Sequence, residues 1–473
     1  MQEAIFKKKT KIVATIGPAT EDEKTMTELV KAGMNVMRLN FSHGDFAEHG
    51  ARVKTARRVA EKLGRPIAIL QDLAGPKIRI GEFYQERVML KKGSIFTLTT
   101  KKIVGDETKA YVNYPLLPKE VKKGGAILLD DGKKRLEVIS TTKDSIVCKV
   151  IVGGETKGKR GVNVPGAYLS ISSITAKDRA DLAFGIKNKV DFVALSFVRK
   201  PKDIETLRGL LKAGKSDAPI IVKIETQEAV ENIDEIITLA DGIMVARGDL
   251  AVEVPAEDVP LLQKMIIEKC NAVGKPVITA TQMLESMINS PVPTRAEVSD
   301  VANSILDGTD AVMLSEETTL GKYPVEAVTV MTRVARKTEE RYMEREYGDE
   351  ADVKSIIDAV TDSVVYVAND INAKAIVALT ESGTTARMIS RFRPKQPIIV
   401  MTPNTRTYNR LALSFGCYPV RIKGFKYVGE VRDGVGKFLV KNGIAKKGDR
   451  VVIAAGVPFG KTGGTNMLLV HTV

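Results

Sequence analysis

Short apolar runs alternate with longer amphipathic stretches from the N-terminus to about residue 345. The runs are rich in Val, Ile, Leu or Met and too short for helices, which predicts strands buried on both faces. Segments between them, such as 21–33 and 226–240, place apolar residues three or four positions apart, as amphipathic helices do. Eight such units predict a (β/α)₈ barrel. Its strands are expected at 11–17, 35–42, 66–73, 191–197, 219–225, 241–247, 276–282 and 310–317.

More than a hundred residues separate the third and fourth predicted strands, which is far beyond an ordinary connection. Within them, apolar and polar positions alternate between Gly, Asp and Lys residues, which predicts a small inserted antiparallel β barrel. Loops that follow barrel strands surround the active site, so this insert is placed to act as a lid.

The pattern restarts after about residue 345 with five apolar runs that alternate with helical segments. This arrangement predicts a separate α/β domain with a mostly parallel sheet. We therefore expect a catalytic barrel formed by 1–75 and 166–345, a lid formed by 76–165, and a C-terminal α/β domain formed by 346–473.

The composition of the 473 residues, with 44% hydrophobic and 27% charged positions, is that of a soluble globular protein. No apolar run approaches the roughly 18 residues of a membrane helix, so no membrane partner is expected. The basic start of the chain lacks the apolar core and cleavage site of a signal peptide. Cys148, Cys270 and Cys417 are far apart, without metal-ligand spacing, and suit the reducing cytoplasm in which we expect the protein.

The net charge of +14 implies attraction to anions, either nucleic acid or small phosphorylated ligands. Basic residues are spread along the chain, and aromatic residues make up only 5% of it, without Trp. Because no stacking platform for bases is visible, we expect no nucleic-acid partner.

Polar residues follow all eight predicted barrel strands, where a barrel enzyme places its chemistry. Any one of them could be a strand-end residue that merely meets solvent. Their presence at every strand favours an active-site ring. Its members are Arg38, Asn40, Ser42, Asp72, Ser196, Lys223, Glu225, Arg247, Asp249, Thr281, Ser315 and Glu317.

Lys223 and Glu225 are two positions apart, so both point to one side of their strand, into the barrel mouth. Asp249 follows the neighbouring strand, and two carboxylates on adjacent strands suit Mg²⁺ or Mn²⁺. The Lys223 ammonium could neutralise a transferring group. The alternative is a buried Lys–Glu pair that only stabilises the barrel. Residues between Asp249 and a helix expected near Ala256 could present N–H groups to a substrate carboxylate.

Arg38 suits a bidentate contact with phosphate, and Asn40 and Ser42 add neutral oxygens on the same strand face. His43 and His49 make a weak metal pair, and a solvent-facing or nucleotide-contacting role for His43 is favoured.

In the last domain, residues 379–388 form a strand, a Ser-Gly-Thr-Thr loop and a helix. Such a loop cradles phosphate or simply caps the helix, and the sequence leaves both alternatives open. A Gly-rich stretch at 456–466 is placed to close over the same ligand.

The sequence resembles the pyruvate kinase family over essentially its whole length. The resemblance rests on KIVATIGPAT (11–20), MRLNFSHG (37–44), KIETQEAVENIDEI (223–236), GIMVARGDLAVEVP (242–255), ITATQMLESM (278–287) and PTRAEVSDVAN (293–303). It implies transfer of a phosphoryl group from phosphoenolpyruvate to ADP, giving pyruvate and ATP in the last step of glycolysis. The family is commonly tetrameric, and its C-terminal domain is regulatory, so a homotetramer with a sugar-phosphate or AMP effector is implied.

By position, the resemblance implies that Glu225 and Asp249 hold Mg²⁺ or Mn²⁺ and that Lys223 stabilises the phosphoryl group in flight. Arg38 and Arg79 would bind phosphate. Backbone N–H groups at Gly248 and Asp249, with Thr281, would hold the substrate carboxylate, and Thr281 would lie near the water that protonates the enolate. Ser315 and Glu317 would belong to an outer proton relay. The implied nucleotide contacts are Pro18, Arg38, His43, Arg79 and Arg160, with Asp131 nearby, and the implied effector contacts are Thr380, Ser382, Gly383, Thr384 and Thr385.

Two departures from the family add acids. Glu316 stands where Gly is usual, and Glu381 stands where activated members often have a positive or neutral residue. Glu381 argues against a highly charged effector unless Lys461 or Arg387 compensates.

A third departure lies in LQDLAGPKIRIG (70–81), where many members have Thr and Glu and require K⁺. This chain has Leu73 and Lys77 at those positions. The cage for K⁺ corresponds to Asn40, Ser42, Asp72 and the carbonyl of Leu73. A Lys ammonium is a compact fixed cation, so we expect Lys77 to supply the charge and activity to be independent of K⁺.

Two rival functions are weighed against this one. A metal-dependent pyruvate aldolase of the barrel type shares an ETxxAVxNxxEI pattern, but the lid, Lys223 and the third domain argue against it. A basic nucleic-acid-binding protein is disfavoured by the polar ring.

Overall fold

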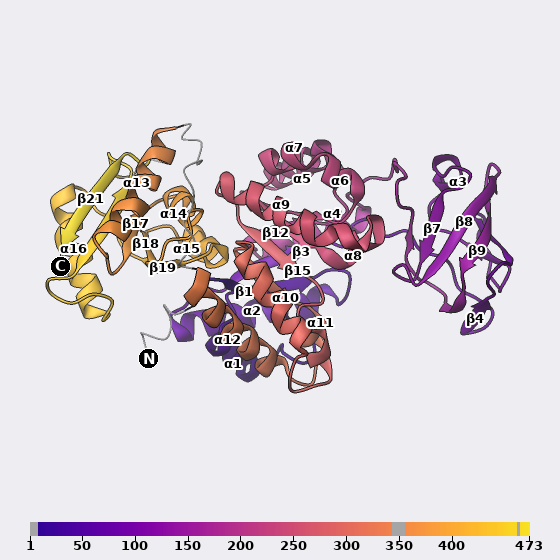
Figure 1. Cartoon of the computed structure of the whole chain (residues 1–473), viewed down its shortest axis with the longest axis horizontal. Helices are drawn as coiled ribbons and strands as arrows, with labels where there is room; N and C mark the ends of the chain where they lie inside the picture. Colours follow the sequence, from indigo (N-terminus) through magenta and orange to yellow (C-terminus); the bar gives the residue numbers. More distant parts are fainter. Residues whose placement is uncertain (1–7, 343–354, 461–463) are drawn as a thin grey trace.

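The computed structural model describes residues 8–342, 355–460 and 464–473, which form three bodies in a row (Figure 1). A closed barrel lies between a small β domain and an α/β domain that carries the C-terminus. Among these described residues, no helix is long and apolar enough to cross a membrane. The domain boundary expected at 345/346 and the compensating Lys461 lie outside the described residues.

The central body is a closed, all-parallel barrel with strand order β1-β16-β15-β14-β13-β12-β3-β2. Every strand lies within one of the eight predicted runs, and nearly all strand residues are buried, as continuous apolar patterns indicate. The (β/α)₈ prediction is therefore confirmed. The strands are β1 (Lys11–Thr15), β2 (Val36–Asn40), β3 (Ala68–Asp72), β12 (Phe192–Leu195), β13 (Ile220–Ile224), β14 (Gly242–Ala246), β15 (Val277–Ala280) and β16 (Ala311–Leu314).

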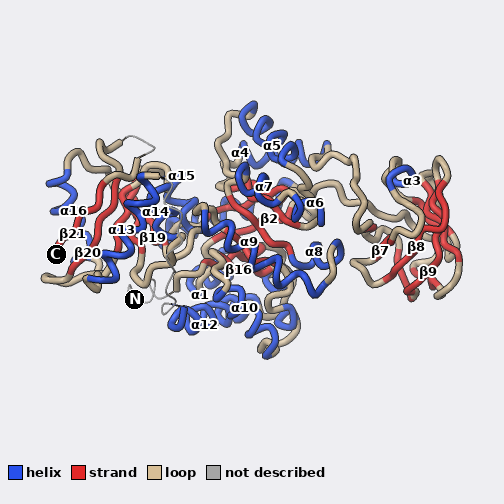
Figure 2. The backbone as a smooth tube through the Cα atoms, turned by 45° about the horizontal axis from the view of Figure 1, so that its top comes forward, coloured by secondary structure: helices blue, strands red, loops and turns tan. Residues whose placement is uncertain are grey.

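Helices surround the barrel strands (Figure 2) and cover their outward apolar side chains in one large core. A helical turn, η2, begins at Ala256, where a helix was expected. The sequence did not predict the helix before it, α8, which contains Asp249 and begins directly at the end of β14. The barrel helices are α1 (Glu23–Ala32), α2 (Phe46–Leu63), α4 (Ala176–Lys187), α5 (Pro201–Ala213), α6 (Gln227–Glu231), α7 (Ile233–Leu239), α8 (Arg247–Glu253), α9 (Val259–Ala272), α10 (Arg295–Leu306), α11 (Glu316–Thr319) and α12 (Pro324–Tyr342), with 3₁₀ turns η2 (Ala256–Asp258) and η3 (Glu285–Ile288).

An Asn or Asp precedes every second strand at the N-terminal end of the barrel, which we call the base. The side-chain oxygen of each accepts the N–H of the neighbouring strand, at 2.8–3.1 Å. Each bond satisfies a backbone donor that would otherwise lie unpaired where the strand begins. The pairs are Asn35 with Ile12, Asp191 with Ile69, Asp241 with Ile220, and Asp310 with Val277.

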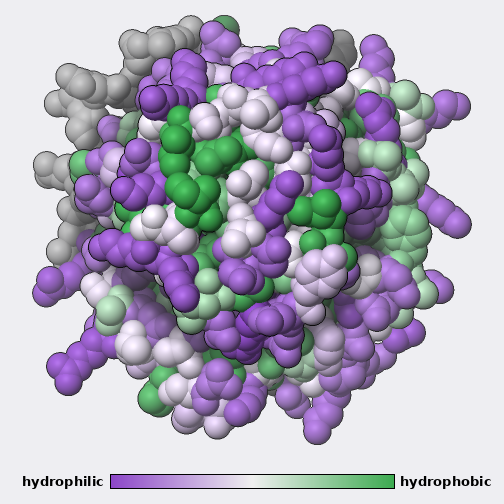
Figure 3. Space-filling view, turned by 90° about the vertical axis from the view of Figure 1, so that its right-hand side faces the viewer, coloured by the Kyte–Doolittle hydropathy of each residue, from purple (hydrophilic) through white to green (hydrophobic). Residues whose placement is uncertain are grey.

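The inserted domain lies between β3 and α4 and has its own apolar core. Its hydrogen bonds make a six-stranded sheet, β11-β7-β8-β9-β5-β6, and a two-stranded sheet, β10-β4, and all pairs are antiparallel except β5–β6. Viewed from this end, the surface is mostly hydrophilic, with small hydrophobic areas (Figure 3). Its elements are β4 (Arg87–Leu90), β5 (Ile95–Thr99), β6 (Lys109–Tyr111), α3 (Leu117–Glu120), β7 (Ala126–Leu129), β8 (Lys134–Thr141), β9 (Ser145–Val152), β10 (Gly154–Lys157) and β11 (Val162–Asn163).

The C-terminal body is a five-stranded sheet of order β19-β18-β17-β20-β21, in which only β21 is antiparallel. Apolar cores lie on both of its faces, as expected for an α/β domain. Its elements are α13 (Ile356–Asp370), β17 (Ile376–Leu379), α14 (Thr384–Ser390), β18 (Ile398–Thr402), α15 (Thr405–Arg410), η4 (Leu411–Leu413), β19 (Cys417–Arg421), α16 (Val428–Lys441), β20 (Arg450–Ala455) and β21 (Met467–Thr472).

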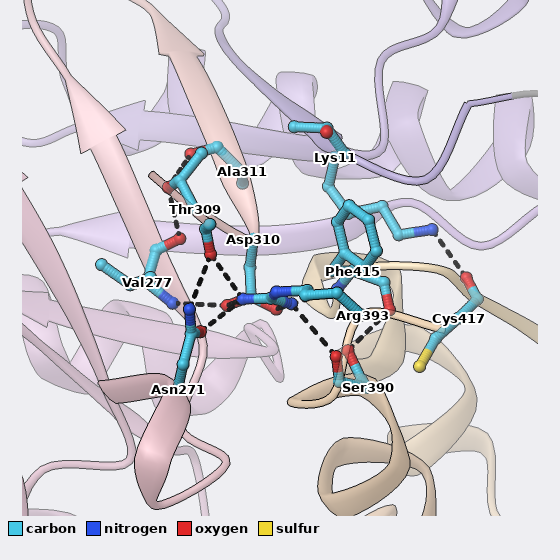
Figure 4. A network of polar contacts seen from close by, with 12 residues as sticks. Lys11, Asn271, Val277, Thr309, Asp310, Ala311, Ser390, Arg393, Phe415 and Cys417 are labelled. Carbon is cyan, nitrogen blue, oxygen red and sulfur yellow. Dashed lines mark hydrogen bonds and ion pairs between the residues drawn. The ribbon is translucent and has the colours of Figure 1, made fainter. Parts of the chain in front are cut away.

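This domain closes the base of the barrel. Ala412 and Leu413 of η4 pack among the inward-facing barrel residues, so the barrel interior is completed by the C-terminal domain. Beside them, Arg393 forms an ion pair with Asp310, 3.0 Å from each oxygen, and donates to the Gly308 carbonyl at 2.6 Å (Figure 4). Such a buried junction predicts that the barrel and the C-terminal domain unfold together.

Candidate active site

The ends of β2, β3, β12 and β13 bring Arg38, Asp72, Ser196 and Lys223 together at the opposite, C-terminal end of the barrel, which we call the mouth. Asp72 Oδ2 lies 2.7 Å from both Arg38 Nε and Arg38 Nη2. Lys223 Nζ donates to Ser196 Oγ at 2.8 Å and lies 3.5 Å from Asp72 Oδ1 and 2.7 Å from Glu225 Oε1. The register of neighbouring strands, such as Asn40 opposite Asp72, produces this convergence.

The opposite charges in this cluster stabilise the charged forms of Lys223 and Asp72. Burial alone would lower the pKa of Lys223, but the carboxylates of Asp72 and Glu225 outweigh it and raise that pKa. Burial would raise the pKa of Asp72, but Lys223 and Arg38 hold it below its ordinary value. Lys223 is therefore a permanent cation whose side chain is only 12% exposed. A charge held in place with so little water is suited to stabilising negative charge that develops on a substrate.

Glu225 is only 1% exposed, and its Oε2 accepts the N–H of Phe197 at 2.7 Å. Oε1 lies 2.7 Å from the Lys223 ammonium, and no other donor among the described residues binds it. Burial raises the pKa of Glu225; Lys223 opposes this shift, and Asp249 adds to it. Two carboxylates that repel each other, one of them with a buried oxygen that only the ammonium approaches among the described residues, fit a divalent cation.

The described residues contain no group of three or more His, Cys, Asp or Glu side chains that could bind a metal by themselves. Glu225 and Asp249 would therefore be the only carboxylate ligands, and the other positions of a Mg²⁺ ion would be left to water and substrate oxygens.

Asp249 and Gly248 lie in the first turn of α8, beside Thr281. The Gly248 N–H donates to Thr281 Oγ1 at 2.8 Å, and Thr281 Oγ1 donates to the Ala280 carbonyl at 2.5 Å. Thr281 has a φ of +75°, an unusual conformation for a β-branched residue. Strain of this kind persists where the surroundings impose it, and it aims the Thr281 hydroxyl at the start of α8.

Arg247 belongs to the predicted ring, but no role could be predicted for it. Its guanidinium forms a bidentate pair with Asp300 on α10, at 2.6 and 2.7 Å, and donates to the Thr281 carbonyl at 2.8 Å. It therefore fixes the loop that carries Thr281. Asp300 was missed because it lies on a helix, α10, and the Phe197 amide because it belongs to the backbone of an apolar residue.

The loop after β3 does not bring Lys77 to the predicted cation cage. Lys77 is exposed, its ammonium end lies against Gly161, and no ion pair joins it to Asp72 within the described residues. Two of the cage oxygens accept hydrogen bonds from neighbouring residues. Asn40 Oδ1 accepts the Ser42 N–H at 3.1 Å, and the Leu73 carbonyl accepts Ser196 Oγ at 2.7 Å.

Four of the five predicted nucleotide contacts are exposed, namely Pro18, His43, Arg79 and Arg160, whereas Arg38 is buried. Arg79 donates to the Lys159 carbonyl at 3.1 Å, and Arg160 Nε lies 3.3 Å from Asp130. Pro18 and His43 lie on loops that follow β1 and β2. The structure thus places Arg79 and Arg160 in the lid region, apart from the mouth cluster that contains Arg38.

A cavity of about 860 Å³, open to solvent, lies between the mouth of the barrel and the part of the lid next to it. Asp249 and Glu253 of α8, Phe197 of the mouth and Lys77 of the β3 loop line it. The Asn163 side chain donates to Glu253 at 2.8 Å, so the lid is joined to the helix that carries Asp249.

The strand-eight acids differ in their surroundings. Glu317 is buried and accepts the N–H groups of Ser315 at 2.7 Å and Leu284 at 3.1 Å, and burial raises its pKa. It ties together the loops after β15 and β16. Glu316 is exposed in the first turn of α11, where an acid is favourable at a helix N-terminus.

A second cavity, of about 1580 Å³ and open to solvent, lies in the C-terminal domain beside the N-terminus of α14. Gly383 begins that helix with a φ of +87°, and its N–H donates to Thr380 Oγ1 at 2.9 Å. Glu381 is part of the wall. The wall also contains the predicted effector residues Thr380, Ser382, Thr384 and Thr385, and the basic residues Lys423 and Lys426.

Comparison with known proteins gives one consistent answer. Residues 7–328 match the family model "Pyruvate kinase, barrel domain", and residues 358–471 match "Pyruvate kinase, alpha/beta domain". The pyruvate kinase of Geobacillus stearothermophilus is 49% identical over 99% of this chain and 81% of its own length. That of Clostridium acetobutylicum is 47% identical over 98% and 99%.

A solved structure of a pyruvate kinase from Cryptosporidium parvum superposes with a TM-score of 0.92 at 35% identity. The match covers 100% of this chain and 97% of that chain. The order of barrel, inserted sheet domain and C-terminal domain is therefore the order found in this relative.

Proposed function

Because the chain belongs to the pyruvate kinase family of phosphotransferases, we propose that it transfers the phosphoryl group of phosphoenolpyruvate to ADP with a divalent cation held by Glu225 and Asp249. The observation that carries this proposal is the buried Glu225 Oε1, which lies 2.7 Å from the Lys223 ammonium and has no other donor among the described residues. The comparisons do not favour the pyruvate aldolase alternative, since the matched family spans both the barrel and the C-terminal domain.

Lys223 and Arg38 would do most of the electrostatic work on the phosphoryl group. Positioning and charge neutralisation dominate such transfers, and both cations are fixed by Asp72 before substrate arrives. When bound, Mg²⁺ or Mn²⁺ would supply Lewis-acid polarisation of substrate oxygens. Arg247 holds the loop of Thr281, whose hydroxyl would lie near the enolate carbon that takes up a proton.

The nucleotide would lie between the barrel and the lid. His43 and Pro18 would contact it from barrel loops, and Arg79 and Arg160 from the lid region. Both arginines are exposed at the cleft, where closure of the lid would bring their charge to the diphosphate and exclude water.

Independence of K⁺ is the finer part of this proposal. Asp72 already pairs with two cations, and the Asn40 and Leu73 oxygens already accept hydrogen bonds, so the cage has little left to attract a monovalent ion. Lys77 would add its positive charge at the edge of the cleft as the lid closes.

The potassium test compares the protein with Lys77→Glu in K⁺ and in tetramethylammonium at equal ionic strength. The unaltered protein should keep its rate in both salts. Lys77→Glu should lose about tenfold in the organic cation and recover in K⁺, because one carboxylate replaces one ammonium near the phosphates. A large loss of rate in the unaltered protein without K⁺ would overturn the proposed independence of K⁺.

We also propose that the C-terminal cavity binds a phosphorylated effector. Backbone N–H groups at the start of α14 and Lys423 and Lys426 offer positive charge, while Glu381 and Glu430 oppose a second phosphate. A monophosphate, either AMP or a sugar monophosphate, therefore fits better than a bisphosphate. A homotetramer remains a proposal taken from the family resemblance.

The test of the main proposal is a coupled assay. ATP should form from phosphoenolpyruvate and ADP in the presence of Mg²⁺ and stop when a chelator removes the metal. Carbon–carbon cleavage of a 2-keto acid without ATP formation would instead support the aldolase alternative.

A further inference from the structure

His49 supports the loop that carries His43. It lies on α2, is 2% exposed, and its ring stacks on Phe41 with 4.2 Å between centroids and 18° between planes. Its Nε2 lies 2.9 Å from the backbone carbonyl oxygen of His43, which is six residues earlier. The side chain thus reaches back across the turn that joins β2 to α2.

The chemistry of this contact fixes the state of the ring. A carbonyl oxygen can only accept, so Nε2 must carry the proton. Burial lowers the pKa of His49, which keeps the ring neutral and leaves Nδ1 unprotonated. Nδ1 is buried and has no hydrogen-bond partner in the described part of the chain.

An apolar side chain would pack on Phe41 equally well, and it would not leave a buried nitrogen unsatisfied. What the histidine adds to this position is therefore the hydrogen bond to the His43 carbonyl.

The loop lies directly on the ring. Gly44 has a φ of +76°, and a side chain there would begin 3.2 Å from His49 Nε2. Asp45 caps α2 by accepting the N–H groups of Ala47 and Glu48 at 2.8 and 2.9 Å. The cap fixes the end of the loop next to the helix, and His49 fixes the stretch that carries the exposed His43 side chain.

We propose that His49 is a positioning residue for the nucleotide: its hydrogen bond holds the His43 backbone so that the His43 imidazole meets ADP. This inference rests on the proposed function and on His43 as a nucleotide contact. His49 itself, beneath the loop, touches no substrate. Its loss should therefore weaken ADP binding and leave the chemistry at Lys223 unchanged.

The experiment compares His49→Met, His49→Gln and Val59→Ala. Met fills the space and packs on Phe41 without a donor, whereas the Gln amide retains a donor near the position of Nε2. Val59 is fully buried on the same helix and far from the loop along the sequence, so its truncation controls for a general loss of stability. Steady-state constants for ADP and phosphoenolpyruvate are measured, together with calorimetric titration of ADP in the presence of Mg²⁺.

We expect His49→Met to raise the KM and the calorimetric Kd for ADP roughly three- to tenfold, the range of one lost hydrogen bond. The kcat and the KM for phosphoenolpyruvate should stay within about twofold. His49→Gln should recover most of the ADP affinity. Val59→Ala should lower the melting temperature but leave the affinity for ADP unchanged.

An unchanged KM for ADP in His49→Met, an equal rise in His49→Gln or Val59→Ala, or a parallel rise for phosphoenolpyruvate would overturn the proposal. If the unaltered protein formed no ATP, the proposed function would fail. The calorimetric titration, which needs no turnover, would still decide the role of His49.

Discussion

Asp310 at the base of the barrel and Glu225 at the mouth are both buried carboxylates at strand ends, 4% and 1% exposed. Both oxygens of Asp310 accept hydrogen bonds: Oδ1 from Phe415 N and Arg393, and Oδ2 from Val277 N and Arg393. In Glu225, Oε2 accepts a backbone N–H, whereas Oε1 lies 2.7 Å from the Lys223 ammonium and has no other donor among the described residues. At the base, the Asp310 carboxylate joins two domains. At the mouth, one oxygen of Glu225 stays available for a ligand.

Lysines at the mouth and at the base of the barrel also differ, in the direction in which their pKa values shift. Lys223 at the mouth lies among acids that raise its pKa. At the base, burial lowers the pKa values of Lys9 and Lys11 to about 8 and of Lys8 to about 7. Lys11 donates to the Cys417 carbonyl at 2.6 Å and lies over the Tyr418 ring. The base therefore uses its lysines as hydrogen-bond donors to backbone oxygens, and the mouth uses Lys223 as a charge.

The same substitution at both ends gives the largest expected difference. Lys223→Met should lower kcat by about 10³-fold or more, since the fixed cation beside the phosphoryl group is lost. Lys11→Met should leave kcat within about twofold, because it removes a donor to one carbonyl far from the chemistry. Coupled-assay kinetics on both purified variants measure this, and equal losses of activity would remove the distinction between the two ends.

Breaking the junction should cost stability instead of activity. Arg393→Met leaves Asp310 buried with fewer donors, which should lower the free energy of unfolding by about 3–5 kcal/mol. Arg406→Ala removes an exposed pair with Asp217 at 2.8 Å between the same two domains and should cost at most about 1 kcal/mol.

Urea denaturation of these junction variants provides the measurement. A small loss in Arg393→Met, no greater than in Arg406→Ala, would show that the junction is not held by its buried ion pair.

The base lysines also predict a dependence of stability on pH. Their folded pKa values of about 7 and 8 lie below the model-compound value of 10.5, so the unfolded chain binds more protons above pH 7. Stability should therefore rise from pH 7 to 9, by roughly 1 kcal/mol per pH unit for each fully titrating group. Above about pH 10 the trend should reverse, because the unfolded lysines lose their protons there as well, while Cys148 and Cys417, whose pKa values burial raises to about 12, keep protons that the unfolded chain has released.

Urea midpoints across this pH range measure the slope, and the Lys8→Met variant should flatten it. A slope that is absent in the unaltered protein, or unchanged in Lys8→Met, would contradict the titration of the base lysines.

The strands and the mouth could be predicted because each signal is local. A buried parallel strand is an apolar run, and its last residues are polar only where they face a ligand or water. Lys223 and Glu225 share a strand, so their spacing alone places them together. The pairing of Arg38 with Asp72 needed the register of neighbouring strands.

The features that could not be predicted depend on contacts between segments that are distant in the sequence. Arg393 and Asp310 are 83 residues apart. No role could be predicted for either, because in the sequence a buried ion pair looks like two surface charges. Helix α8 was not predicted, because Arg247 was taken as the last residue of the strand expected at 241–247. Lys77 was expected at the cation cage, but its side chain follows the lid toward Gly161.

Binding of Mn²⁺ without substrate, followed by electron paramagnetic resonance, separates the two carboxylates most directly. We expect the unaltered protein to bind Mn²⁺, Glu225→Gln to bind it at least about tenfold more weakly, and Asp310→Asn to bind it within about twofold of the unaltered protein. Equal binding by Glu225→Gln and the unaltered protein, or equal weakening in Asp310→Asn, would contradict the assignment of the metal to the mouth.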